Sequence, residues 1–345
     1  MLQWTETAQQ TTADRAWRRF VASFLAVFVG GLAAIYAFIL LVDPYDTGRF
    51  PALPLSGVAE PYKATANVSR ARDPQFNAAV IGNSHGQLLD PARLSHATGL
   101  SVVQLTTPGS GPREQLATMR WFLRHHPDAA AIIITIDNRW CGQDPRIPVT
   151  YPFPFWLYRG DLEYLANVLS TRSLGAASKR LMLQFGRGVA ANRDGASDYE
   201  AGRAWNFHPG IPERFAAAAT SAAGPVLDLP YPALERLMSA AAGLSPSTRL
   251  VLVMPPVFYT ALPGAGSRSA AELASCKAVF ARWTGQRPGS VFLDFLVDTP
   301  MSRDPHNFMD TEHYRSAFAR EIERRIAAAL AGTVMRPEAN ARREQ

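Results

Sequence analysis

The sequence contains few cysteines, few lysines and no metal-binding pattern. Neither of its two cysteines, Cys141 and Cys276, belongs to a CxxC motif or a histidine-rich cluster, so we expect no metal site and no cofactor. Only three of the 35 basic residues are lysines, and the arginines are scattered along the chain. The formal charge of +6 is therefore a weak indication of nucleic-acid binding, and we expect no nucleic-acid partner.

The chain also lacks the polar bias of disordered proteins. Of its 345 residues, 47% are hydrophobic and 19% are charged, which is enough apolar material for a sizeable core. Internal repeats and low-complexity blocks are absent. A chain of this length is expected to form one main domain of roughly 250 to 300 residues, with additional segments.

One long uncharged stretch lies near the N-terminus, at residues 20–42. At 1.5 Å per residue it can cross a hydrocarbon core of about 30 Å, which predicts one transmembrane helix. Basic residues precede it and acidic residues follow it: Arg15, Arg18, Arg19, Asp43 and Asp46. The positive-inside rule then puts residues 1–19 in the cytoplasm and the main domain in the periplasm, anchored to the inner membrane. A cleaved signal peptide is the alternative, but the apolar run continues well past its small-x-small site at Gly31, which favours an uncleaved anchor.

Export changes the interpretation of the two cysteines. Outside a bacterial cytoplasm, Cys141 and Cys276 can oxidise to a persistent disulfide. Two buried, reduced cysteines are the alternative, and their long separation in the sequence leaves both open.

Short apolar runs alternate with helical patterns from residue 78 onward. These continuous runs are typical of strands covered on both faces. They occupy residues 78–82, 101–105, 131–136, 249–254 and 290–295. One predicted helix opens at Pro112, and the last runs from about Thr311 to Leu330. We therefore predict an α/β domain with a parallel sheet over 78–331.

Three further segments flank or interrupt this domain. Residues 43–77 are rich in proline, glycine and polar residues without a sustained period, which predicts an extended linker. The interval 142–245 begins with aromatic and proline residues and interrupts the alternation, which indicates a mainly helical insertion over the active face. Residues 332–345 form a predicted disordered tail.

A group of residues with hydrolase chemistry lies at the ends of predicted strands. Ser84 follows the first strand, where a tight turn would expose its oxygen, and a serine needs a base and an orienting acid to become a nucleophile. Asp310 and His313 are three residues apart, which lets the carboxylate accept from Nδ1 and leaves Nε2 to face Ser84. Gly109, past the second strand, can bring a backbone N–H to the oxyanion. Taken alone, Asp310 is also an ordinary helix N-cap.

These residues resemble the SGNH or GDSL hydrolases and their membrane-anchored acyltransferase relatives. Gly-Asn-Ser at 82–84 matches the G-D/N-S of block I, Gly109 matches the glycine of block II, and Asp310 with His313 matches the D-x-x-H of block V. The resemblance implies a flavodoxin-like, three-layer α/β/α fold. It also implies that Ser84 is the nucleophile, with its N–H and that of Gly109 in the oxyanion hole.

Block III, G-x-N-D, is where the chain departs from the family, because residues 135–138 read TIDN. The strict register puts Asp137 at the position of the oxyanion-donating asparagine, and a carboxylate there would repel an oxyanion. Asn138 can serve as the donor only with a shift of one residue. Losing one such donor costs about 100-fold to 1000-fold in rate in other hydrolases.

Residues 82–86 also match G-x-S-x-G, the nucleophile elbow of α/β-hydrolases. That fold needs several strands before the elbow, whereas Ser84 follows the first strand of the domain, so we expect Gly86 to be incidental. His85 is expected to have a structural or substrate-facing role rather than to act as the base.

The resemblance implies a membrane-anchored serine esterase or O-acyltransferase. Its substrates would be acyl, above all acetyl, esters of envelope or exported polysaccharide, or small acyl esters, processed through an acyl-Ser84 intermediate. Water as the second acceptor gives an esterase and a sugar hydroxyl gives a transferase, and the sequence does not decide between them. A membrane protein of polysaccharide modification is a candidate partner. The alternative is a non-catalytic, membrane-tethered scaffold or carbohydrate-binding protein that has kept the fold.

Overall fold

The structure is a computed structural model that describes residues 3–50, 53–55, 57–59, 63–209 and 227–332. The chain divides into two compact units, each of which is discontinuous in sequence. The first unit comprises Met1–Ala59 and Gly160–Ala190, and the second comprises Glu60–Arg159 and Ala191–Gln345.

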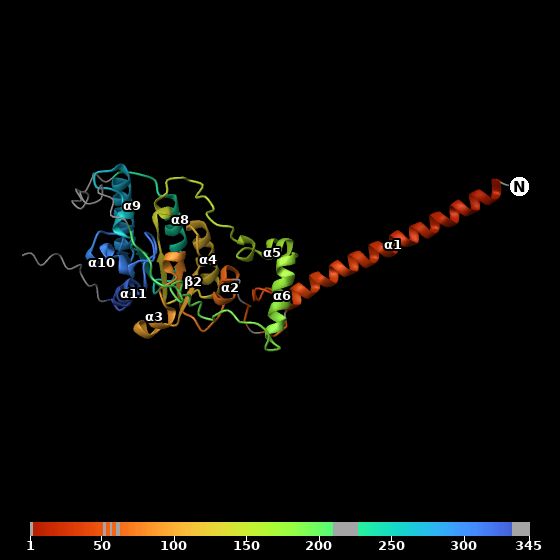
Figure 1. Cartoon of the computed structure of the whole chain (residues 1–345), viewed down its shortest axis with the longest axis horizontal. Coiled ribbons are helices and arrows are strands. Elements are labelled where there is room, and N and C mark those ends of the chain that lie inside the picture. The colour runs from red at the N-terminus through yellow and green to blue at the C-terminus, as the bar shows by residue number, and fades with distance from the viewer. Residues whose placement is uncertain (1–2, 51–52, 56, 60–62, 210–226, 333–345) are drawn as a thin grey trace, which may run out of the picture. The chain divides into compact units, whose positions relative to one another are not determined.

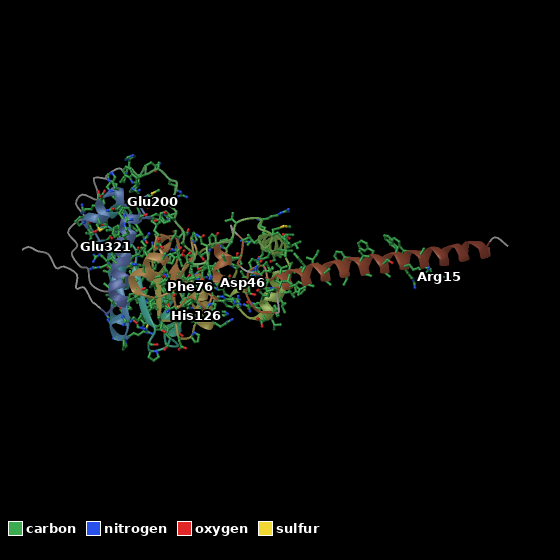
Figure 2. The ribbon with its side chains drawn as sticks, turned by 90° about the horizontal axis from the view of Figure 1, so that it is seen from below. Arg15, Asp46, Phe76, His126, Glu200 and Glu321 are labelled. Atoms are coloured by element: carbon green, nitrogen blue, oxygen red, sulfur yellow. A yellow bond between two sulfur atoms is a disulfide. The ribbon has the colours of Figure 1, made fainter. Side chains whose placement is uncertain are left out.

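A long N-terminal helix, α1 (Gln3–Val42), dominates the first unit. Its segment Asp14–Val42 is long and apolar enough to cross a membrane. The helix begins before the predicted 20–42 because no proline or glycine precedes Gly30 to stop it. It ends where Asp43 adopts a left-handed φ of 45° and a proline follows. Figure 2 shows Arg15 toward the N-terminal end of α1 and Asp46 just beyond its other end.

Two short helices, α5 (Asp161–Val168) and α6 (Thr171–Leu183), belong to the same unit. Figure 1 shows them beside the C-terminal end of α1, although more than a hundred residues separate them from it in sequence. The segment predicted as one insertion, 142–245, therefore contributes to both units. Its third described helix, α8 (Pro232–Ala241), lies in the second unit, and the residues 210–226 lie outside the described part of the chain.

The second unit contains a five-stranded sheet, and every pair of neighbouring strands is parallel. The strands are β1 (Ala78–Gly82), β2 (Val102–Thr106), β3 (Ala131–Thr135), β4 (Arg249–Met254) and β5 (Ser290–Asp294). Their order in the sheet is β2-β1-β3-β4-β5. The predicted α/β class and parallel sheet are confirmed, and each predicted run forms one strand with its ends shifted by at most one residue.

Helices cover both faces of this sheet (Figure 1). On one face, α3 (Pro91–Thr98) and α11 (Ser316–Leu330) form a core with alternate residues of the strands, such as Val80 and Val251. The other face carries α2 (Lys63–Arg70), α4 (Pro112–His125), α8 and α9 (Arg268–Gln286). A short helix, α10 (Pro300–Arg303), precedes α11. The continuous apolar strands are thus buried from both sides.

The structure differs from the prediction at two segment boundaries. Part of the expected linker 43–77 forms α2, which docks on the sheet because the Asn67 side chain donates to the Thr106 carbonyl at 3.1 Å. The last helix begins at Ser316 rather than Thr311, because the preceding residues form a turn described below. The predicted tail lies outside the described residues from residue 333 onward.

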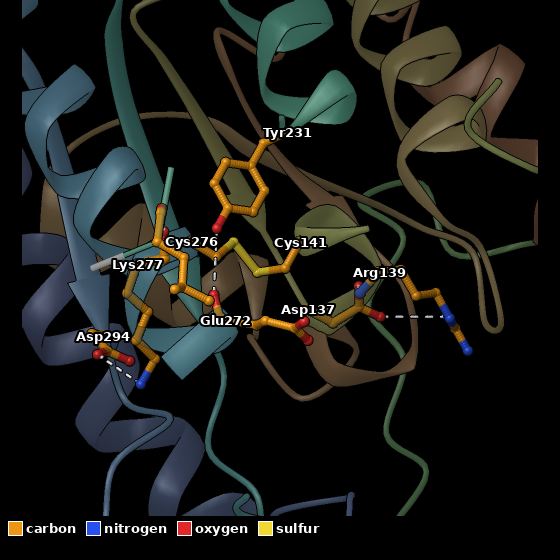
Figure 3. The surroundings of a disulfide bond; sticks show 10 residues. Asp137, Arg139, Cys141, Tyr231, Glu272, Cys276, Lys277 and Asp294 are labelled. Atoms are coloured by element: carbon orange, nitrogen blue, oxygen red, sulfur yellow. Dashed lines mark hydrogen bonds and ion pairs between the residues drawn. A yellow bond between two sulfur atoms is a disulfide. The ribbon is translucent and has the colours of Figure 1, made fainter. Parts of the chain in front are cut away.

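Cys141 and Cys276 form a disulfide, with a Cα–Cα distance of 5.6 Å. Cys141 ends η2 (Asn138–Cys141), a 3₁₀ turn that follows β3, and Cys276 is fully buried in α9. Figure 3 shows the bond between these two elements, with Asp137 and Arg139 on the η2 side. The bridge therefore fastens the loop after β3 to a helix that packs on the sheet.

Candidate active site

Ser84 lies on a sharp turn at the carboxyl end of β1. Asn83 is extended, and Ser84 opens a 3₁₀ turn, η1 (Ser84–Gly86), which the Asn83 side chain caps by accepting from the His85 N–H at 3.0 Å. A Cβ on Gly82 would lie 1.8 Å from Thr135 Oγ1 on the neighbouring strand. Only glycine fits there, so the residue before the turn is dictated by close strand packing.

Gly86 has a structural reason of its own. A Cβ on Gly86 would lie 3.0 Å from Thr106 Cγ2 and 3.1 Å from Thr135 Oγ1, at the ends of β2 and β3. Because Gly86 has no side chain, the serine turn can pack closely against the ends of β2 and β3. Gly86, which was expected to complete the G-x-S-x-G match only by coincidence, thus has a packing role in the serine turn.

The Asp310–His313 segment is a hydrogen-bonded turn that precedes α11. Asp310 Oδ1 accepts from the backbone N–H of Glu312 at 2.8 Å and of His313 at 2.7 Å. The His313 ring then returns to the same carboxylate, with Nδ1 2.9 Å from Asp310 Oδ2, and its Nε2 lies 3.0 Å from Ser84 Oγ. The structure therefore brings together three residues that are separated by up to 229 positions.

Aromatic rings flank His313 on two sides. The His85 ring centroid lies 5.4 Å from that of His313, and the Tyr199 ring lies edge-on at 5.6 Å. The Tyr199 hydroxyl donates to the Tyr314 carbonyl, and the Tyr314 hydroxyl donates to the His85 carbonyl. These contacts connect the turn that holds His313 with the turn that holds Ser84.

The surroundings of the site lower the pKa values of both Asp310 and His85, for different reasons. Burial raises the pKa of Asp310, but the N–H groups of Glu312 and His313 and the His313 ring outweigh it, so the net pKa lies below its usual value. Burial, then the nearby His313 and Arg139, lower the pKa of His85 to about 4. His85 is therefore neutral at physiological pH.

The loop after β2 packs against the serine turn. The N–H of Thr107 donates to the Gly82 carbonyl at 2.9 Å, and Ser110 Oγ donates to the same oxygen at 3.3 Å. Gly109 has a φ of 73°, a conformation that favours glycine. In the described part of the chain, neither the Ser84 N–H nor the Gly109 N–H donates a hydrogen bond to another protein group.

Asp137 follows β3 and is buried, and both of its oxygens accept hydrogen bonds. Asn83 Nδ2 donates to Oδ2 at 2.7 Å, and the Arg139 N–H donates to Oδ1 at 3.0 Å. The Arg139 guanidinium lies 3.4 Å from Oδ2 and donates to the Ser110 carbonyl at 3.3 Å. Burial raises the pKa of Asp137, and Arg139 opposes that rise. The carboxylate is thus bound to the residue that precedes Ser84.

Asn138, the other candidate donor, is exposed at the first position of η2. Within the described residues it makes no hydrogen bond to Ser84, Asp310 or His313. Of the predicted site residues, the structure thus gathers Ser84, Asp310 and His313 and brings the Gly109 loop against the serine turn. The oxyanion role of Asn138 stays a prediction.

The segment 191–209 supplies contacts that the sequence reasoning did not assign. Besides Tyr199, Glu200 forms an ion pair with Arg315 and accepts from the Ser316 N–H at 2.8 Å, at the start of α11. Glu200 therefore fixes the start of α11, which follows His313. Burial raises the pKa of Glu200, but the hydrogen bonds from Ser316 and Arg315 outweigh it, so the net pKa is lowered. No local pattern in the sequence marks either residue, because their partners lie about 115 positions away.

The arrangement provides the parts of a serine nucleophile that faces solvent. His313 is half-buried and Asp310 is exposed, so the hydroxyl, base and acid stand at the surface. His313 can accept the Ser84 proton at Nε2 while Asp310 stabilises the resulting charge at Nδ1. Across the described residues, no group of three or more His, Cys, Asp or Glu side chains is placed to hold a metal ion. A scan against models of protein families gives no match for this chain, and neither does a search of curated proteins.

Proposed function

We propose that this chain is a membrane-anchored, SGNH-like serine esterase or O-acyltransferase. Its substrates are acyl, above all acetyl, esters of envelope or exported polysaccharide. The observation that carries the proposal is the 3.0 Å approach of His313 Nε2 to Ser84 Oγ, with Asp310 at 2.9 Å on the opposite ring nitrogen. This geometry is the one that converts a weakly nucleophilic hydroxyl into a nucleophile.

The proposed reaction has two halves. Ser84 Oγ attacks the acyl carbonyl while His313 Nε2 takes its proton, and the oxyanion is stabilised by the N–H groups of Ser84 and Gly109. Collapse expels the sugar oxygen, which receives the proton from His313 and leaves an acyl-Ser84. In the second half, His313 deprotonates water or a sugar hydroxyl, which attacks the acyl-Ser84 and releases the serine.

Two features of the second unit support this assignment. The strand order β2-β1-β3-β4-β5 is that of the flavodoxin-like doubly wound sheet, in which sites form beyond the carboxyl ends of the strands. Ser84, the Gly109 loop and Asp137 follow the carboxyl ends of β1, β2 and β3. The exposure of His313 and Asp310 suits a long polymeric substrate, which would not fit into an enclosed cavity.

The anchor and the location are part of the proposal. Residues 20–42, within the candidate segment Asp14–Val42, would span the inner membrane, with residues 1–19 in the cytoplasm and the second unit in the periplasm. An alkaline phosphatase fusion after residue 60 is expected to be active, because that enzyme needs export to fold. An inactive fusion contradicts the exported location.

Labelling with a fluorophosphonate tests the chemistry, because this probe reacts with activated serines. The full chain in detergent is expected to be labelled, and Ser84→Ala and His313→Ala are expected to lose the label. His306→Ala is the matched control: His306 pairs with Asp304 at 3.0 Å on the same segment and makes no hydrogen bond to Ser84 in the described residues. Equal labelling of all four proteins contradicts the proposal and favours a non-catalytic scaffold.

A further inference from the structure

The first unit exposes large apolar side chains on α5, at the end of α6 and in the residues that follow α6. Leu162 is 84% exposed on α5, and Phe185 and Val189, just beyond the end of α6, are 70% and 71% exposed. Leu162, Ala166 and Leu169 are spaced i, i+4 and i+7 and are all exposed, whereas Tyr164 and Val168 form the buried face of α5. The outer face of α5 thus carries the exposed apolar side chains of Leu162 and Ala166, and the C-cap residue Leu169 continues this stripe.

These helices are attached to the last turns of the candidate membrane span. The Tyr36 hydroxyl donates to the Leu165 carbonyl of α5 at 2.9 Å. Tyr36 lies six residues before Val42, the end of α1, so this contact is about 9 Å back along the helix axis at 1.5 Å per residue. If α1 crosses a bilayer, α5 is held at the depth of the outer interface.

A buried arginine fastens α6 to the same end of α1. Arg180, almost fully buried, donates to the carbonyls of Val42 and Gly57 at 2.8 Å and forms an ion pair with Asp46 at 3.2 Å. The Tyr45 hydroxyl adds a hydrogen bond to Ser173 Oγ at 3.1 Å. The depth of α6 relative to α1 is therefore set by buried polar contacts as well as by packing.

Charge on α6 suits a lipid surface. Arg172 and Lys179 are exposed on this helix, and Arg187 is exposed just after it. Cationic side chains beside exposed apolar ones are the composition of helices that lie in a membrane interface, where the apolar face enters the headgroup boundary by about 5 to 10 Å. The depth set by Tyr36 falls within that range.

We propose that α5 and α6, which follow one another in sequence and are together called the hairpin below, embed their exposed apolar side chains in the outer leaflet of the bilayer that α1 spans. The hairpin rests on the anchoring part of the proposed function and is independent of the chemistry at Ser84. The first unit would then contact the membrane twice, through the transmembrane helix α1 and through the two interfacial helices, which would hold this unit at the membrane surface.

Site-directed fluorescence tests the hairpin on the full chain. The two native cysteines are joined in the disulfide, so one introduced cysteine is a unique thiol for an environment-sensitive maleimide dye. Leu162→Cys and Met182→Cys report on α5 and α6. Met238→Cys, on α8, is the matched control for Met182, because the two methionines are 41% and 44% exposed. Val27→Cys reports on the middle of α1.

Each labelled protein is placed in vesicles of phosphatidylcholine with phosphatidylglycerol that carry a doxyl spin label either near the headgroup or deep in the acyl chain. The headgroup-level label is expected to quench the dyes at 162 and 182 about twofold or more beyond the dye at 238. The deep label is expected to quench the dye at 27 most strongly. Equal quenching at 162, 182 and 238, with strong quenching at 27, overturns the hairpin and leaves the anchor intact.

Absence of quenching at 27 overturns the anchor and the hairpin together. Fluorophosphonate labelling of the same samples reports on Ser84 separately, so a failure of the chemistry is distinguishable from a failure of the hairpin.

Discussion

Asp137→Asn tests how the loop after β3 serves Ser84. The Asp137 carboxylate accepts from Asn83 Nδ2 at 2.7 Å on one oxygen and from the Arg139 N–H at 3.0 Å on the other. A carboxamide has only one acceptor oxygen, so its NH₂ group must face one of these two donors. One buried hydrogen bond is then lost, because the new NH₂ group faces either the Asn83 NH₂ group or the Arg139 N–H, and both are donors.

The size of the effect follows from that loss. A buried donor left without a partner costs about 1–3 kcal/mol, and a cost of about 2 kcal/mol expressed at the serine turn corresponds to about 30-fold in rate. We therefore expect the second-order rate of fluorophosphonate labelling to fall by about this factor in Asp137→Asn. The reason is that Asn83 also caps the turn that begins at Ser84.

A reciprocal exchange provides the control. In Asn83→Asp with Asp137→Asn, the new amide donates to the new carboxylate, its oxygen still accepts from the Arg139 N–H, and the carboxylate still accepts from the His85 N–H. We expect the double variant to recover about half or more of the lost free energy. Labelling of Asp137→Asn at or above the wild-type rate refutes this reasoning, because it would mean that the carboxylate repels the oxyanion, as the motif alone suggests.

Three further predictions concern stability, measured by chemical unfolding of the full chain in detergent. The lowered pKa of His85, about 4 against 6.5, means that the unfolded chain binds the proton more tightly. The neutral His85 ring therefore contributes about 3 kcal/mol to the free energy of unfolding above pH 6.5, and this contribution is lost as the pH falls through 4. His85→Gln should remove that part of the pH dependence, and an unchanged profile contradicts it. Replacing Cys141 and Cys276 together with serine should lower the free energy of unfolding by about 2–5 kcal/mol, whereas no loss would show that the bridge is dispensable. Gly82→Ala should cost about 1–3 kcal/mol, and Thr135→Ala should relieve much of that cost in the double variant; a neutral Gly82→Ala would refute the close strand approach.

The sheet could be predicted from the sequence because its signal is local. Each strand is a mainly apolar run, as in 78–82, and both faces of the sheet are covered by helices. The start of the last helix was less predictable. Asp310 caps a turn through its side chain, and the pattern cannot distinguish such a turn from a helix N-cap until the His313 ring is placed.

The surroundings of the site were harder to predict because they depend on distant contacts. Tyr199 and Glu200 act on the His313 turn from a segment with no regular period, and a motif comparison carries no information about them. Asp137 shows what alignment with the block III motif cannot reveal. The alignment suggested that the Asp137 carboxylate would repel an oxyanion, whereas in the structure this carboxylate accepts a hydrogen bond from Asn83, 54 residues earlier.

The central claim is an acyl enzyme formed on Ser84, and intact mass spectrometry tests it most directly. The full chain is incubated with an acetyl ester of a polysaccharide and quenched rapidly in acid. Its intact mass is then measured, and the protein is digested to locate the modified peptide. We predict one acetyl group on the peptide that contains Ser84, absent from Ser84→Ala and strongly reduced in His313→Ala. No adduct on the wild type, together with ester turnover that Ser84→Ala leaves unchanged, would contradict the claim.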